Sequence, residues 1–182
     1  MKSEMDLNKL PQPCVFCANH TSYLDIIVSY IVIPNYFVYM AKQELDKAPL
    51  FRIFFKKMNI LVDRKSKIGS HKAFVKAGEE IDKGHSVFLF PEGTISKDGI
   101  LKPFKNGPFK LAIEKQIPIV PITFANNWTI LQNGGFLKAT GCPGVAKVVI
   151  HDAIETKGMT EENLVDLRTK VHEKITSSLI RS

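Results

Sequence analysis

Residues 14–25 read CVFCANHTSYLD and contain the first strand-to-helix unit of the chain. The first five are apolar and end at a polar cluster, 19–22, which predicts a buried strand entering a turn. Ser22 is a good helix N-cap, with Asp25 three residues later. The pattern therefore predicts a helix that begins at Ser22 and stops at Pro34.

The alternation of strand and helix continues along the chain. Apolar and β-branched runs predict further strands at 36–40, 60–62, 87–90, 119–124 and 145–150. Helical spacing of apolar residues predicts helices at 49–58, 70–82, around 111–113 and at about 161–179. We therefore expect residues 1–182 to form a single α/β domain with a mostly parallel mixed sheet flanked by helices, including one or two antiparallel pairs.

The composition limits the classes of partner and compartment. The formal net charge of +7 favours anionic partners, which are nucleic acid, acidic lipid surfaces or phosphorylated substrates. No nucleic-acid-binding signature occurs, so we expect no nucleic-acid partner. An odd number of cysteines, three, and no signal peptide favour the reducing cytoplasm. The longest apolar stretch, 26–40, is interrupted and too short to span a bilayer.

His20 and Asp25 form a His-x4-Asp pattern at the predicted strand-to-helix turn. Side chains in a first helical turn lean toward the N-terminus, so the carboxylate can reach the imidazole. Such a pair serves as a general base and the group that orients it. The alternative is that Asp25 only caps the helix, and the motif taken alone favours that alternative.

A second polar block follows the apolar strand 87–90. Gly93 allows close backbone approach to a ligand, and Thr94 has a hydroxyl that can bind phosphate oxygens. Glu92 would hold Arg64 or accept a hydrogen bond from a substrate hydroxyl. In isolation, Pro-Glu-Gly is better explained as a simple turn.

Three cations lie near these strand ends: Arg64, Lys102 and Lys105. Arginine recognises phosphate with two parallel hydrogen bonds and lysine acts as a point charge, so the three could bind a substrate phosphate. Each cation alone is more typical of a solvated surface. Their conjunction with His20 and Glu92 at strand ends favours an anion site.

Four ordered segments, 19–25, 61–64, 90–94 and 117–121, resemble the motifs of the glycerolipid acyltransferase family, in particular those of 1-acylglycerol-3-phosphate acyltransferases. The resemblance implies the family's α/β fold. It also implies transfer of a fatty-acyl group from acyl-CoA or acyl-carrier protein to the sn-2 hydroxyl of 1-acylglycerol-3-phosphate (lysophosphatidate), giving phosphatidate in phospholipid synthesis. No metal or cofactor is expected.

The resemblance also assigns roles to individual residues. It implies that His20 deprotonates the acceptor hydroxyl with Asp25 as its partner. It further implies binding of the glycerol phosphate by Arg64, Glu92, Gly93 and Thr94, a place for Lys105 in the basic stretch after the third motif, and an acyl-side motif at Pro121.

Two departures from the family pattern bear on the acyl pocket and on membrane attachment. Met58-Asn59 stands where the family has a glycine, and the N-terminal hydrophobic anchor of many members is not present in this sequence. We expect peripheral attachment to the cytoplasmic face of a membrane, for which the predicted helix 49–58 is the candidate. Packing of that helix against the sheet is equally compatible with its pattern.

Two other functions remain open at this point. One is an acyltransferase with a different lyso-lipid acceptor, for example an acylated amino acid. The other is a non-catalytic lipid-binding protein of the same fold, against which the intact His20 and Asp25 argue.

Cys14-x2-Cys17 followed by His20 resembles half a zinc site, but we expect the two thiols on opposite faces of a strand. The remaining histidines show no partner in the sequence and are expected at the surface or on helices: His71, His85, His151 and His172.

Overall fold

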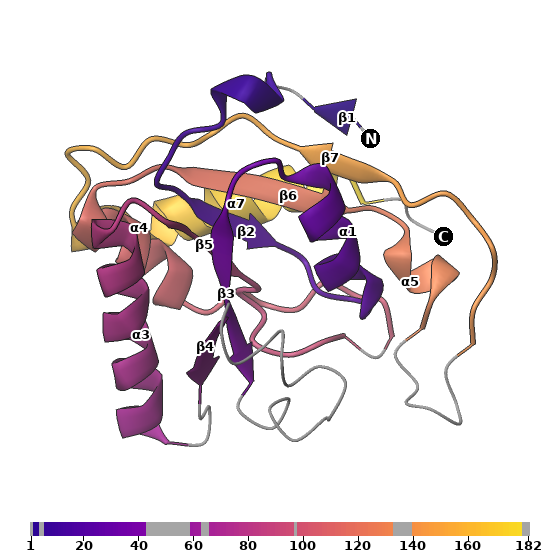
Figure 1. The fold of residues 1–182 in the computed structure, drawn as a ribbon, viewed down its shortest axis with the longest axis horizontal. Coiled ribbons are helices and arrows are strands. Elements are labelled where there is room, and N and C mark those ends of the chain that lie inside the picture. Colours follow the sequence, from indigo (N-terminus) through magenta and orange to yellow (C-terminus); the bar gives the residue numbers. More distant parts are fainter. Residues whose placement is uncertain are drawn as a thin grey trace.

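The computed structural model describes residues 2–3, 6–42, 59–62, 66–96, 98–132 and 140–179. Within these ranges one seven-stranded sheet has the order β1-β7-β6-β2-β5-β3-β4 (Figure 1). The strands are β1 (Lys2–Ser3), β2 (Val15–Ala18), β3 (Phe37–Lys42), β4 (Asn59–Val62), β5 (Ser86–Leu89), β6 (Ile119–Phe124) and β7 (Val148–Ile150). The helices are η1 (Leu7–Lys9), α1 (Leu24–Val32), α3 (Lys67–Asp82), α4 (Gly107–Lys115), α5 (Asn127–Ile130), η3 (Glu161–Asn163) and α7 (Leu164–Ser177).

The sheet is parallel except at one pair. β2 lies between β5 and β6 and is parallel to both, and β3 is parallel to β4 and β5. β7 runs antiparallel to β6. The predicted mostly parallel mixed sheet is therefore confirmed.

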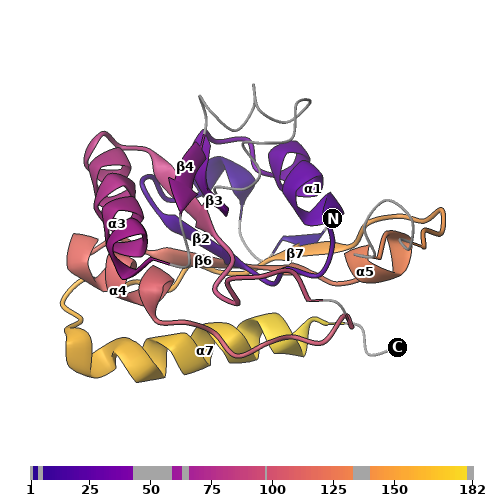
Figure 2. The ribbon, with the colours of Figure 1, turned by 90° about the horizontal axis from the view of Figure 1, so that it is seen from below.

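Helices cover both faces of the sheet, which explains why the central strands β2, β5 and β6 are buried throughout. One core cluster joins α3, α4 and α7 to one face, with α7 contributing Leu167, Val171 and Ile175 as its spacing predicted. The other face packs against α1 and the residues around Leu10. Figure 2 shows α7 on one side of the sheet and α1 on the other.

Several predicted boundaries were wrong by a few residues. α1 begins at Leu24 with Tyr23 as its N-cap residue, whereas Ser22 was expected to cap it. α3 begins earlier than expected because the Ser66 side chain accepts a hydrogen bond from the Gly69 amide and caps the helix there. The late strand begins only at Val148. The predicted helix 49–58 lies outside the described residues.

His151 and the two cysteines of the first strand region are all buried. His151, expected at the surface or on a helix, is buried with 1% exposure, and its Nε2 lies 2.9 Å from Thr123 Oγ1. It follows β7 directly, so the sheet encloses it. Cys14 and Cys17 belong to the core clusters on opposite faces of the sheet, as predicted. Burial raises the pKa of Cys14 to about 12, so its thiol stays protonated.

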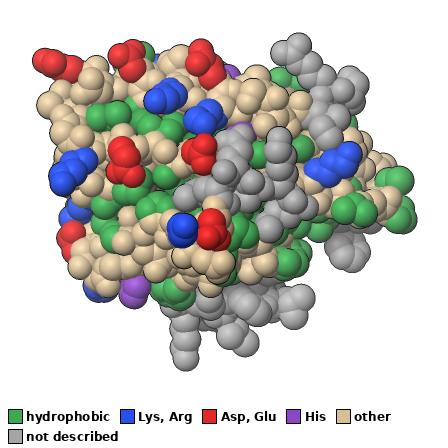
Figure 3. All heavy atoms as spheres, turned by 90° about the horizontal axis from the view of Figure 1, so that it is seen from above, with side chains coloured by type: hydrophobic (Ala, Val, Ile, Leu, Met, Phe, Trp, Pro, Cys, Tyr) green, Lys and Arg blue, Asp and Glu red, His purple; other side chains and the backbone are tan. Residues whose placement is uncertain are grey.

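The face drawn in Figure 3 carries interspersed acidic and basic side chains among its described residues. The net charge of +7 therefore does not form a uniformly basic surface on that face. Among the helices of the described ranges, none is both long enough and apolar enough to cross a bilayer.

Candidate active site

The candidate site lies at the carboxyl edge of the sheet. Because β2, β5 and β6 are parallel neighbours, their carboxyl ends meet at one edge. His20 comes two residues after β2, Glu92 follows β5 and Asn127 begins α5 after β6. α1 and α5 lie on the same side of the molecule in both ribbon views (Figures 1 and 2). Segments far apart in sequence therefore converge there.

His20 and Asp25 are paired as the sequence predicted. His20 Nδ1 lies 3.0 Å from Asp25 Oδ2, and the exposed fractions of the two side chains are 9% and 0%. An ionised carboxylate only accepts hydrogen bonds, so Nδ1 carries the proton and donates it. The neutral imidazole then presents Nε2 as an acceptor, which is the state a general base requires.

Asp25 receives three further hydrogen bonds besides the one from His20. Oδ2 also accepts from the backbone amides of Thr21 at 2.8 Å and Ser22 at 2.9 Å. Oδ1 accepts from Asn127 Nδ2 at 2.8 Å. Asp25 thus bonds the backbone before α1 and His20 at the same time. The role of the pair as a general base and its orienting group stays a prediction.

Phe90 forms one wall of the histidine site. Its ring stacks on the His20 imidazole with centroids 3.8 Å apart and an angle of 11° between the planes. Phe90 also packs against Tyr39, whose hydroxyl is hydrogen-bonded to Ser29 in α1. The imidazole is therefore fixed by Asp25 at its edge and by an aromatic ring on its face.

Glu92 has contacts that the sequence did not predict. Its Oε1 accepts from the His20 amide at 2.6 Å, and its Oε2 accepts from the Lys102 amide at 3.0 Å. The residue is 3% exposed, and burial raises the pKa of its carboxyl group to about 7, against the opposing effect of these two donors. The carboxylate joins the turn after β2 to the loop after β5. Its expected role in substrate binding stays a prediction.

Gly93, which follows Glu92 in the chain, lies next to Lys105. Gly93 has φ 71°, and a Cβ placed on it would lie 2.7 Å from Lys105 Nζ. The Lys105 backbone amide donates to Pro91 O at 2.9 Å, which holds the basic loop over the turn. Thr94 is exposed in the same turn. A glycine without a side chain thus makes room for an ammonium group, and phosphate binding at this turn stays a prediction.

The motifs also name Arg64 and Pro121. Arg64 lies outside the described residues. Pro121 is a buried residue within β6, paired in register with Cys17 of β2.

Sequence reasoning missed Asn127 and did not assign Phe90 a role at the histidine. Asn127 is 102 residues from Asp25, and no local pattern links the two. The one available signal was the position of Asn126-Asn127 directly beyond the predicted strand 119–124, at the sheet edge where the other polar groups were expected.

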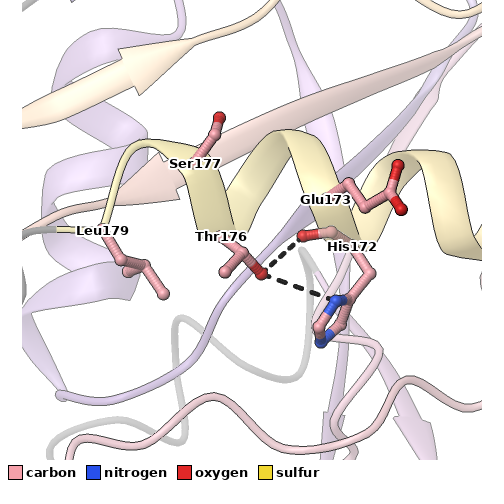
Figure 4. A pocket seen from close by; sticks show the side chains of 5 residues that line it. All are labelled: His172, Glu173, Thr176, Ser177 and Leu179. Atoms are coloured by element: carbon pink, nitrogen blue, oxygen red, sulfur yellow. Dashed lines mark hydrogen bonds between the residues drawn. The ribbon is translucent and has the colours of Figure 1, made fainter.

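A hollow of about 570 Å³ lies along the end of α7 and is lined by His172, Glu173, Thr176, Ser177 and Leu179 (Figure 4). Thr176 Oγ1 donates to the carbonyl of His172 at 2.7 Å, so it satisfies its own helix. None of the lining residues belongs to the strand-end cluster, and nothing in this hollow matches the chemistry of the His20 site.

Comparison with known proteins agrees with this geometry. The sequence pattern of the acyltransferase family matches residues 4–125. The chain is 34% identical over 157 residues to the chloroplastic 1-acyl-sn-glycerol-3-phosphate acyltransferase BAT2 of Brassica napus, covering 81% of this chain and 43% of that protein. It is 30% identical over 172 residues to the 1-acyl-sn-glycerol-3-phosphate acyltransferase of Haemophilus influenzae, covering 87% and 65%.

A solved structure is similar over nearly the whole chain. The crystal structure of the 1-acyl-sn-glycerophosphate acyltransferase PlsC from Thermotoga maritima superposes with a TM-score of 0.78 at 25% identity, covering 97% of this chain and 69% of that one. The chain spans about half the length of the curated relatives it matches. The mostly parallel sheet has a paired histidine and aspartate at its carboxyl edge. Because the family pattern matches residues 4–125, the chain belongs to the acyltransferase family.

Proposed function

We propose that this protein transfers a fatty-acyl group from a thioester, acyl-CoA or acyl-carrier protein, to the sn-2 hydroxyl of 1-acylglycerol-3-phosphate. The product would be phosphatidate, an intermediate of phospholipid synthesis. The observation that carries the proposal is the buried bond of 3.0 Å between His20 Nδ1 and Asp25 Oδ2 at the carboxyl edge of the sheet. The names of the relatives supply the acceptor.

In the proposed reaction His20 acts as the general base. Nε2 takes the proton of the acceptor hydroxyl as its oxygen attacks the thioester carbonyl carbon. The tetrahedral intermediate collapses by breaking the carbon–sulfur bond, and the thiolate leaves. Asp25 stabilises the imidazolium that forms in the first step. A thiolate is a good leaving group, so the second step needs no strong acid.

The phosphate of the acceptor is proposed to bind beside the Gly93 turn. Arg64, Thr94 and Lys105 would contact its oxygens. Glu92 would fix the backbones of His20 and Lys102 and accept from the glycerol portion. This arrangement is supported by the position of Lys105 Nζ, which would lie 2.7 Å from a Cβ on Gly93, and by the hydrogen bond that the His20 amide donates to Glu92.

We also propose peripheral association with the cytoplasmic face of a membrane, since the proposed acceptor and product are both lipids. Sedimentation with vesicles of anionic phospholipid tests it. Binding that weakens as salt is raised supports electrostatic attachment, and the absence of binding at low salt contradicts it.

The transfer reaction is tested with purified protein, lysophosphatidate and palmitoyl-CoA. His20→Ala should lower turnover by about two to four orders of magnitude. His85→Ala is the matched control, because His85 also has a carboxylate partner, Glu80, yet lies away from the carboxyl edge. Equal turnover of His20→Ala and wild type would contradict the mechanism. A wild type that binds lysophosphatidate without turnover would indicate a lipid-binding protein instead.

The acceptor is tested separately with Arg64→Ala. This variant should lose saturation with lysophosphatidate while its activity toward a monoacylglycerol, which has no phosphate, stays at the wild-type level. Equal losses toward both acceptors would contradict a phosphate contact. Preference of the wild type for an acylated amino acid over lysophosphatidate would replace the proposed acceptor with another lyso-lipid.

A further inference from the structure

Asn127 contacts the carboxylate that orients His20. Asn127 opens α5 and is fully buried, and its Nδ2 lies 2.8 Å from Asp25 Oδ1. A carboxylate oxygen can only accept, so the amide nitrogen faces it and the amide oxygen points elsewhere. Within the described residues Asn127 Oδ1 is buried without a hydrogen-bond partner. The side-chain amide is therefore oriented to donate to Asp25, and this orientation leaves its carbonyl oxygen without a hydrogen bond among the described residues.

The two oxygens of Asp25 accept hydrogen bonds from different parts of the chain. Oδ2 receives His20 Nδ1 and the two amides of its own turn, Thr21 and Ser22. In the described part of the chain, Asn127 is the donor to Oδ1. Without it, a buried carboxylate oxygen would lack its charge-assisted bond, and the carboxylate could rotate away from the imidazole.

The backbone around Asn127 is joined to the histidine turn on both sides. Asn19 bonds the backbone of Phe124 twice, accepting from its amide at 2.8 Å and donating to its carbonyl at 3.0 Å. Ser22 Oγ donates to the carbonyl of Leu131 at 2.7 Å. Asn127 lies between these two attachment points, so the segment 124–131 holds its amide at a fixed place relative to Asp25.

We propose that Asn127 is a positioning residue that acts through Asp25 to hold His20 in its base-competent tautomer. The inference rests on the proposed function for its effect on turnover, and it stands on geometry alone for its effect on the imidazole. Asn127, Asp25 and His20 then form one continuous chain of hydrogen bonds from α5 to His20 Nδ1, across the ring from the reacting Nε2.

The kinetic test compares Asn127→Leu with Asn126→Leu. Asn126 is the adjacent residue of the same type, and its amide makes two hydrogen bonds: it donates to the carbonyl of Val145 and accepts from the amide of Lys147. Asn127→Leu should lower kcat about ten- to hundredfold, the value of one charge-assisted bond, with KM for lysophosphatidate unchanged. Asn126→Leu should leave kcat within about twofold, although among the described residues it removes two amide hydrogen bonds and Asn127→Leu removes one.

An isosteric variant separates positioning from packing. Asn127→Asp keeps the shape of the side chain but donates to Asp25 only when a proton is shared between the two carboxyl groups. Its kcat relative to wild type should therefore rise as pH falls from about 8 to about 5.5. The corresponding ratio for Asn127→Leu should stay flat over the same range, because leucine cannot become a donor.

A spectroscopic test does not depend on turnover. The ¹⁵N spectrum of histidine-labelled protein, with His20 assigned by comparison with His20→Ala, should show protonated Nδ1 and bare Nε2 in wild type and in Asn126→Leu. Asn127→Leu should shift the His20 signals toward the other tautomer. If Asn127→Leu matches Asn126→Leu in both kcat and the His20 spectrum, the inference is overturned. A wild type without transferase activity would contradict the proposed function, and the spectra would still decide the role of Asn127.

Discussion

Two histidine–carboxylate pairs in this molecule have the same spacing and similar bond lengths. His20 and Asp25 are five residues apart and bonded at 3.0 Å, while Glu80 and His85 are five residues apart and bonded at 2.8 Å. The first pair follows β2 at the carboxyl edge of the sheet. The second precedes β5, at the amino end of that strand.

The surroundings of the two carboxylates differ. Asp25 is fully buried and accepts from backbone amides and Asn127. The side chain of Glu80 is 23% exposed and also accepts from Lys83 Nζ at 2.7 Å. Water and the exposed Lys83 can compete with His85 for Glu80. Among the described residues, the other partners of Asp25 are two backbone amides and the buried Asn127. A bonded pair is therefore a candidate base only where the protein also fixes the carboxylate.

The largest predicted difference comes from the carboxylates themselves. Asp25→Asn should lower kcat by about three to four orders of magnitude, because a neutral amide cannot stabilise the imidazolium that forms on His20 as the carboxylate does. Glu80→Gln should change kcat by less than about twofold. The check is a turnover assay of both variants at equal concentrations of folded protein. A loss below tenfold for Asp25→Asn would remove the distinction between the two pairs.

The pH dependence of stability should have opposite signs in the two regions. Burial raises the pKa of Glu92, beside His20, from 4.5 to about 7, so its stabilising contribution is present below about pH 4.5 and lost as pH rises to about 7. Hydrogen bonds from Lys83 and His85 lower the pKa of Glu80, so its contribution is present above its unfolded pKa and lost as pH falls.

Denaturant unfolding at several pH values measures this contrast. The unfolding free energy of wild type minus that of Glu92→Gln should fall by roughly 2 kcal/mol between about pH 5 and pH 7.5. The same difference for Glu80→Gln should not fall with rising pH. A constant difference for Glu92→Gln would show that its carboxyl group titrates normally.

Two glycines with positive φ provide a test of the proposed phosphate site. A Cβ at Gly93 would displace Lys105 Nζ, whereas no atom of the described residues lies within 4 Å of a Cβ at Gly84, in the turn beside His85. Both alanine variants should lose about 1 kcal/mol of stability from the left-handed backbone. Only Gly93→Ala should also raise KM for lysophosphatidate, by about three- to tenfold. Equal KM values in the two variants would mean that Lys105 does not contribute to phosphate binding.

The aromatic neighbours of the two histidines provide the smallest contrast. Phe90 stacks on His20, and Tyr36 meets the ring of His85 edge-on with centroids 4.9 Å apart. Phe90→Leu should lower kcat about two- to tenfold, because a stacked pair contributes about 0.5–1.5 kcal/mol. Tyr36→Leu should leave kcat unchanged. Identical kinetics of the two variants would mean that the stack does not hold the imidazole.

The sequence predicted the parts of the fold that depend on local patterns. The strand before His20 and the apolar stripe Leu167, Val171 and Ile175 of α7 were found as expected, because burial imposes a period that a single segment displays. The short helix α5 was not predicted, since four residues contain no period. The antiparallel β7 was found with a later start than its apolar pattern indicated.

The site was predictable to the extent that its residues follow strands. His20 and Asp25 were paired correctly because both lie in one turn. The contacts of Asn127 with Asp25 and of Glu92 with the His20 amide were not predictable. They join segments 102 and 72 residues apart, and only the order of strands in the sheet brings those segments together.

The most direct test of His20 as a base changes the acceptor instead of the protein. In a lysophosphatidate analogue with a thiol at sn-2, the thiol has a pKa of about 8.5 and ionises without a general base. The natural hydroxyl does not. At about pH 9, His20→Ala should lower kcat relative to wild type by a factor that is at least about tenfold smaller with the thiol acceptor than with the hydroxyl acceptor. Equal deficits for the two acceptors would contradict proton removal by His20.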